Sequence, residues 1–311
     1  MSHHWGYVGA LGSAILFGLS STLNKISLSN VNPIVVAGMI YFVGAIFLLL
    51  LHSSPLHKKL LALFETKTET EHEISKKDYK TLGLAILFGS VLAPLLLLEG
   101  LNLTTAVNAS LLLTTESLFT VAIAFIFLGE RGAKKDYFGI ILLLVGVLVV
   151  TTDGNFLGTN LNVGISGNLL VLGACLFWGL DNTFCKFLSK KTEIVYITGL
   201  KCLIGGGILL AMPLFLGISY DVPLGSLPYI LTVGAFSIAL SILLFLFALR
   251  EIGSMRTGII YSISSLFGAV FAFFTLEESF SIIQLLAGIA MLIGVYILYL
   301  KPKQSFLDAP K

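Results

Sequence analysis

Apolar residues gather in ten long stretches along the chain, and mostly short polar segments separate them. Each stretch is close to the roughly 20 residues that an α-helix needs to cross the hydrocarbon core of a membrane. The pattern therefore predicts an all-α integral membrane protein with ten transmembrane helices. The predicted spans are 5–26, 33–51, 81–98, 105–128, 137–152, 167–188, 195–216, 227–249, 257–276 and 282–300.

The ten spans fall into two similar blocks of five. The segment 15–25 reads ILFGLSSTLNK and the segment 176–186 reads LFWGLDNTFCK, with Gly, Leu, Thr and Lys aligned. A second match aligns SLF at 117–119 with SLF at 265–267. A duplication of this kind is typical of carriers, whose substrate site lies where the two repeats meet.

The duplication predicts how the chain is divided. The expected parts are a first five-helix repeat at 1–152 with a charged cytosolic loop at 52–80, a linker at 153–166, a second repeat at 167–300 and a cytosolic tail at 301–311.

Positive charge lies almost entirely on one side of the predicted spans. Of the 19 Lys and Arg residues, 17 lie in or at the edge of the second, fourth, sixth and eighth connections or in the C-terminal tail. The positive-inside rule then predicts that the N and C termini are both cytosolic. Because each repeat has five helices, the second repeat must enter the membrane from the opposite side. We therefore expect inverted repeats, which suit transport by alternating access.

Composition agrees with the membrane assignment. Hydrophobic residues make up 56% of the 311 residues and charged residues only 12%. A soluble core could not bury so much apolar surface. The three cysteines lie in apolar spans without metal-ligand spacing, and no Walker A, HExxH or GxSxG pattern occurs. We therefore expect no cofactor, no metal site, no nucleic-acid partner and no enzymatic activity.

Short motifs recur at matching places in the two halves, at the ends of the first and fourth helices and along the last helix. They are Phe17-Gly18 with Lys25, Phe177-Trp178-Gly179 with Lys186, Leu128-Gly129-Glu130-Arg131, Leu276-Glu277-Glu278, and the glycines Gly139, Gly146, Gly288 and Gly294. On these motifs the chain resembles the EamA type of the drug/metabolite transporter superfamily over nearly its whole length. The resemblance implies export or exchange of small metabolites, often amino acids, at the cell (cytoplasmic) membrane.

Glu116 is the strongest candidate for substrate binding. It lies about ten residues from one end of the fourth span, close to the middle of the membrane, where charged groups are costly and usually functional. Steps of four residues place it in a polar, small stripe that we expect to line the space between the repeats. The stripe is Asn108, Leu112, Glu116, Thr120 and Ala124, and its equivalent is Arg256, Ile260, Ser264, Gly268 and Ala272. The alternative is that Glu116 only packs helices together through a hydrogen bond.

Asp181 and Lys201 form a second constellation. They lie at similar depth before and after the sixth connection, and an ion pair between them would avoid two unpaired buried charges. Such a pair could gate the pathway, contact substrate or serve structure alone. Trp178 and Asn182, close to Asp181 in sequence, would suit a ligand with an apolar part and a polar head.

The remaining candidates are weaker. Tyr41 and Tyr261 could contribute to the substrate site. Asn24 and Lys25 could pair with Glu99 as a gate at the outer mouth, although Lys25 could also simply reach the interface. Arg256, at the start of the ninth span, is a further gating candidate.

These observations predict a secondary transporter, an exporter or exchanger of small polar metabolites, with amino acids as the leading substrate class. Its partners would be the small-molecule substrate and the lipid bilayer, with protons at Glu116 as the candidate coupling ion. Drug-like cations, nucleotide sugars and phosphate esters remain alternative substrates. A channel and an intramembrane enzyme are the rival classes. The sequence leaves the oligomeric state open.

Overall fold

The computed structural model describes residues 4–54, 76–127, 134–152, 163–188 and 194–300, and these contain helices and turns but no strand. Within the described ranges, ten helical segments are long and apolar enough to cross a membrane. The predicted all-α membrane fold with ten spans is thereby confirmed.

The helices of the first half are α1 (His4–Ser27), α2 (Pro33–Ser53), α4 (Lys76–Ala85), η1 (Ile86–Leu92), α5 (Ala93–Leu103), α6 (Ala106–Leu112), α7 (Thr115–Phe127) and α8 (Lys134–Thr152). Those of the second half are α9 (Val163–Leu188), α10 (Ile194–Leu216), α11 (Leu227–Thr232), η2 (Val233–Leu240), α12 (Ser241–Ser262), α13 (Ser264–Leu276) and α14 (Ile282–Tyr299).

Helix boundaries differ from the prediction mainly at two helix starts. Residues 163–166, expected in the linker, form the first turn of α9, and residues 76–80, expected in the charged loop, begin α4. Hydropathy detects only the apolar part of a helix, so the charged turn at 76–80 escapes it. The rest of the loop (55–75), the rest of the linker (153–162), the tail (301–311) and the motif residues 128–131 lie outside the described residues.

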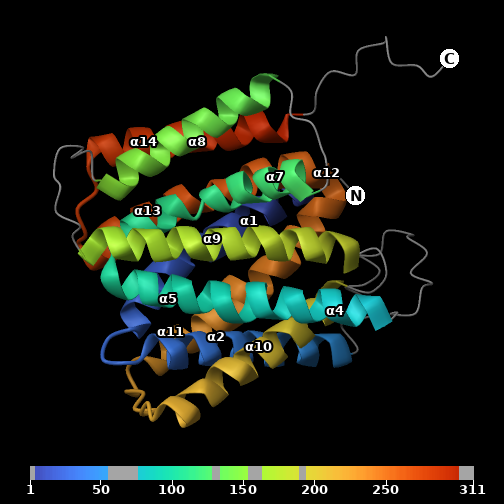
Figure 1. Ribbon diagram of the computed structural model, residues 1–311, viewed down its shortest axis with the longest axis vertical. Coiled ribbons are helices and arrows are strands. Elements are labelled where there is room, and N and C mark those ends of the chain that lie inside the picture. The colour runs from blue at the N-terminus through green and yellow to red at the C-terminus, as the bar shows by residue number, and fades with distance from the viewer. Residues whose placement is uncertain (1–3, 55–75, 128–133, 153–162, 189–193, 301–311) are drawn as a thin grey trace.

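The two halves are interleaved. Helix α1 packs against α12 and α13 of the second half, and α9 packs against α5 and α7 of the first. Helices α8 and α14 pair along one edge of the bundle, and α2 and α10 pair along the opposite edge (Figure 1). Two glycines at matching places in the duplicated sequence allow close approach. A Cβ on Gly18 would lie 2.6 Å from the carbonyl oxygen of Ser264, and one on Gly179 would lie 3.0 Å from Cβ of Phe119.

Both halves also depart from regular α-helix at corresponding places. The third span of each half contains a π-helical segment, η1 in the first and η2 in the second. The fourth span of each half is interrupted at Leu113–Thr114 and at Ile263, respectively. Interruptions of this sort in a membrane occur where the backbone is buried in protein or lines a cavity. The inverted orientation of the halves and the cytosolic termini stay predictions.

Candidate functional site

A cavity of about 410 Å³ lies between the two halves. Its wall includes both interruptions of the fourth spans, at Leu113–Thr114 and at Ser262–Ser264. Hydroxyl groups dominate its polar part, and they belong to Thr114, Ser117, Thr120, Ser262, Ser264 and Ser265. Four aromatic side chains form much of the remaining wall, namely Phe17, Phe245, Tyr261 and Tyr299. Such a mixture of apolar walls with a few polar groups is usual for small-molecule sites.

Glu116 is the one charged side chain among the described residues that line this cavity. It lies in the first turn of α7, immediately after the interruption of the fourth span. Asn182 of α9 donates from Nδ2 to Glu116 Oε1 at 2.7 Å, and the same nitrogen lies 3.5 Å from Thr120 Oγ1. The carboxylate is thus held by a residue from the other half and still lines the cavity.

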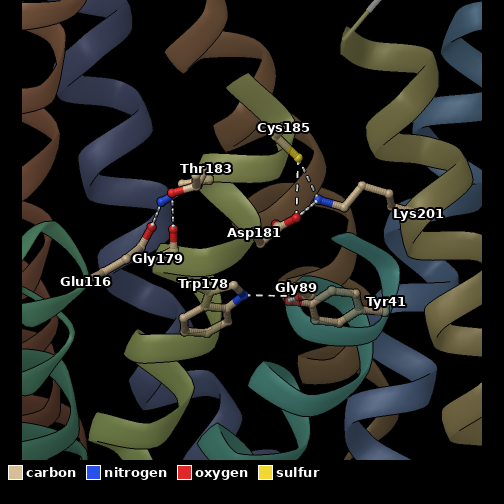
Figure 2. A network of polar contacts seen from close by, with 10 residues as sticks. Tyr41, Gly89, Glu116, Trp178, Gly179, Asp181, Thr183, Cys185 and Lys201 are labelled. Atoms are coloured by element: carbon tan, nitrogen blue, oxygen red, sulfur yellow. Dashed lines mark hydrogen bonds and ion pairs between the residues drawn. The ribbon is translucent and has the colours of Figure 1, made fainter. Parts of the chain in front are cut away.

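A second network lies on a different face of α9. Lys201 of α10 forms an ion pair with Asp181 Oδ1, as the sequence predicted, and both side chains are largely buried. The Cys185 thiol donates to the same Oδ1 at 3.3 Å and accepts from Lys201 Nζ at 3.0 Å (Figure 2). None of these three residues lines the cavity. Whether the pair gates transport stays a prediction.

The π-helical segment η1 lies against this network. The Gly89 carbonyl oxygen accepts from Trp178 Nε1 at 3.1 Å and from the Tyr41 hydroxyl at 3.4 Å (Figure 2). A Cβ on Gly89 would lie 2.2 Å from the Asp181 carboxyl carbon, so a larger residue here would displace the Asp181 side chain. A π turn leaves carbonyl groups free for such contacts. Trp178 and Tyr41, expected at the substrate site, are used in the structure to hold η1.

Further polar contacts join the halves at the end of the bundle where α5 finishes and α6 begins. Glu278 accepts from the backbone N–H groups of Ala106 and Val107, each at 2.9 Å. Thr104 donates to Asn168 Oδ1 at 2.6 Å, and Gln284 donates to Asn108 Oδ1 at 2.8 Å. We call Thr104, Asn108, Asn168, Glu278 and Gln284 the closing cluster.

The proposed gate at this end has a different geometry from the expected one. Lys25 donates to the carbonyl oxygens of Leu101 and Thr104, the latter at 2.6 Å, and no ion pair joins it to Glu99 within the described part of the chain. The carbonyl groups at a helix end lack partners in their own helix, so they attract a cation. Glu99 lies one turn inside α5 rather than at its end. Asn24 is buried beside Lys25, and its Oδ1 has no hydrogen-bond partner among the residues that the structure describes.

The expected stripes are divided by the interruptions. Asn108 lies before the first interruption and faces Gln284, whereas Glu116 lies after it and faces Asn182. In the second half, Ser264 lines the cavity, but Arg256 is exposed outside it and donates to the Tyr7 hydroxyl at 3.0 Å. One helical face therefore does not continue through either fourth span, because each contains a break.

The cavity thus gathers four of the predicted substrate residues, namely Glu116, Asn182, Tyr261 and Ser264. Sequence reasoning missed the roles of Glu278 and Gln284. A signal for Gln284 existed: Ser281 and Gln284 form a capping box at the start of α14, which fixes the Gln side chain near the helix end.

Comparison with known proteins decides the family. The sequence pattern of the EamA-like transporter family matches residues 4–152 and again 165–300. The chain belongs to the EamA-like transporter family. An "uncharacterized transporter" of Methanothermobacter thermautotrophicus is 44% identical over 299 residues, covering 96% of this chain and 87% of the relative. The family and its relatives are transporters and not enzymes.

Two further similarities are more distant. A "probable amino-acid metabolite efflux pump" of Salmonella typhimurium is 27% identical over 192 residues, covering 62% of this chain and 56% of that protein. A solved crystal structure aligns with a TM-score of 0.64 at 14% identity, covering 95% of this chain and 96% of the other, and shows the same fold.

Proposed function

We propose that this EamA-like transporter is a secondary carrier that moves a small polar metabolite with an amino group through the cavity at Glu116. Amino acids and related amines are the leading substrate class. The proposed mode of transport is export or exchange at the cell membrane. The observation that carries the proposal is the Glu116–Asn182 contact, in which a carboxylate from one half is oriented by an amide from the other at the cavity wall. The distant amino-acid metabolite efflux pump is consistent with this class.

Alternating access is supported by the uneven distribution of contacts along the bundle. The closing cluster joins the halves at one end. The cavity instead extends toward the other end, since Tyr299 of its wall ends α14 and Gly258 lies near the start of the ninth span. With the predicted cytosolic termini, the closed end faces outside and the cavity faces the cytosol. Opening the other way requires the contacts of the closing cluster to separate.

Phosphate esters and nucleotide sugars fit the cavity less well than substrates with an amino group. Such anions are normally held by converging Arg or Lys side chains. Among the described residues of the wall there is no Lys or Arg, and the one charge is negative. Protons are the proposed coupling ion, because Glu116 could exchange a proton as substrate binds and leaves.

Counterflow in proteoliposomes tests the proposal, since it requires a carrier but no ion gradient. We expect the purified protein to exchange one labelled pool from a panel of amino acids, amines, nucleosides and sugar phosphates. Glu116→Gln should abolish that exchange. Glu277→Gln, which removes an exposed carboxylate far from the cavity wall, should retain it. Equal exchange by wild type and Glu116→Gln would refute the site, and exchange of sugar phosphates alone would refute the substrate class.

A further inference from the structure

The charges around the cavity narrow the substrate class further. We infer that the site binds organic monocations, which carry an ammonium group on an apolar body and have no free carboxylate. Amines, amides and esters related to amino acids are of this class, whereas zwitterionic amino acids are not. The inference rests on the proposed function and specifies the ligand of the same cavity.

In its ionised form the partly buried Glu116 carboxylate is stabilised by a positive partner, and the described residues of the protein supply none. In the described structure, the side chain that donates to the Glu116 carboxylate is the Asn182 amide, which is neutral. Among the described side chains, Lys201 pairs with Asp181 and Lys25 donates to backbone carbonyl groups. An ammonium group of the substrate would therefore be the charge that compensates Glu116.

A substrate carboxylate would have no comparable partner in the same space. Charge-assisted contacts from Arg or Lys are the strong ones for carboxylates, and the described wall of the cavity has neither. Backbone N–H groups at a helix break could serve instead. Here the amides of Glu116 and Leu266 already donate to the carbonyl groups of Leu113 and Ile263. Bringing a second negative charge close to Glu116 would add repulsion in a poorly hydrated site.

The aromatic wall suits the apolar body of such a cation. Tyr261 lies between Phe17 and Phe245, with ring centroids 5.3 Å and 4.9 Å away, and all three rings line the cavity. Their faces and edges offer apolar contact, and an ammonium group within about 6 Å of a ring is further attracted to it. The volume of about 410 Å³ suits a ligand the size of a single-ring amine.

Calorimetric titration of the full-length protein in lipid nanodiscs tests the inference with matched ligands. Phenylalanine, phenylalaninamide and 2-phenylethylamine share one ring and one ammonium group, and only phenylalanine carries a carboxylate. We expect phenylalanine to bind about tenfold more weakly than either of the others, because its carboxylate exchanges water for neutral hydroxyl donors and is repelled by the Glu116 carboxylate. Glu116→Gln should weaken the two cations about tenfold and Glu277→Gln should leave them unchanged.

The possible outcomes separate the inference from the proposed function. If both cations bind no more tightly than phenylalanine, the inference is overturned, and Glu116-dependent counterflow of phenylalanine would still support the proposed carrier. If the cations bind tightly through Glu116 but no pool shows counterflow, the ligand class stands and the carrier proposal falls. Cation binding that Glu116→Gln leaves intact would overturn the assignment of the site.

Discussion

Lys201 of α10 reaches Asp181 of α9 beside the π-helical segment η1, which packs against both helices. Glycines make this arrangement possible. The Asp181 carboxyl group covers the Cα of Gly89, and a Cβ on Gly205 of α10 would lie 2.6 Å from the carbonyl oxygen of Ser90. The ion pair therefore joins two helices of the second half at the place where both pack against the third span of the first half.

Removing one partner of this ion pair should destabilise the fold. Lys201→Met leaves the Asp181 carboxylate buried without its cation, which typically costs about 3–5 kcal/mol. The double variant Asp181→Asn with Lys201→Met removes both charges and should recover most of the loss. Thermal unfolding in detergent micelles measures both effects. A single variant as stable as wild type would contradict a structural role for the pair and would leave gating or substrate contact.

The packing of α10 on η1 predicts opposite outcomes at two neighbouring glycines. Gly205→Ala forces its new methyl group against the Ser90 backbone and should cost about 1–3 kcal/mol. Gly207→Ala has nothing within 4 Å of its Cβ and should be neutral or slightly stabilising, since alanine favours helix. Unfolding midpoints of the two variants give the comparison. Equal loss at both positions would contradict the close packing at Ser90.

The closing cluster predicts the local stability of α6. Glu278→Gln removes the charge and one of the two acceptors that hold the N–H groups of Ala106 and Val107, and contacts of this charged kind contribute about 1.5–3 kcal/mol. Amide hydrogen exchange in peptides that cover 104–112 should then be about tenfold faster or more. The neighbouring Glu277→Gln, at an exposed position, is the control. Unchanged exchange in Glu278→Gln would mean that other contacts keep this end closed.

The contact between Trp178 and the π-helical segment can be tested by removing its hydrogen-bond donor. Trp178→Phe keeps one aromatic ring but loses the smaller ring of the indole, with the N–H group that donates to Gly89. A hydrogen bond of this kind contributes about 0.5–1.5 kcal/mol, so the unfolding midpoint should fall modestly. Because Trp178 does not line the cavity, binding affinity at Glu116 should change far less than in Asn182→Ala. A larger loss of binding in Trp178→Phe than in Asn182→Ala would place the indole in the binding path.

The spans were predictable from sequence, while the distribution of polar side chains around them was only partly so. Hydropathy responds to apolar length, and that is why it located ten spans yet missed the charged first turn of α4. Hydropathy does not distinguish an α-helix from a π-helix, so it could not predict η1 and η2. Asp181 and Asn182 are adjacent and thus about 100° apart around α9. Sequence reasoning placed both near one ligand, whereas the structure directs Asp181 to Lys201 and Asn182 to Glu116.

The π-helical segments have a consequence for the surface of the third spans. A π turn holds one residue more than an α turn, so the helix beyond it is rotated by about 100° relative to an uninterrupted α-helix. In the first half, α4 and α5 are therefore two short helices with separate angular registers, and η1 is where the register changes. Deleting one residue within 86–92 would restore a continuous α-helix. It would also turn either α4 or α5 away from α9, against which both now pack.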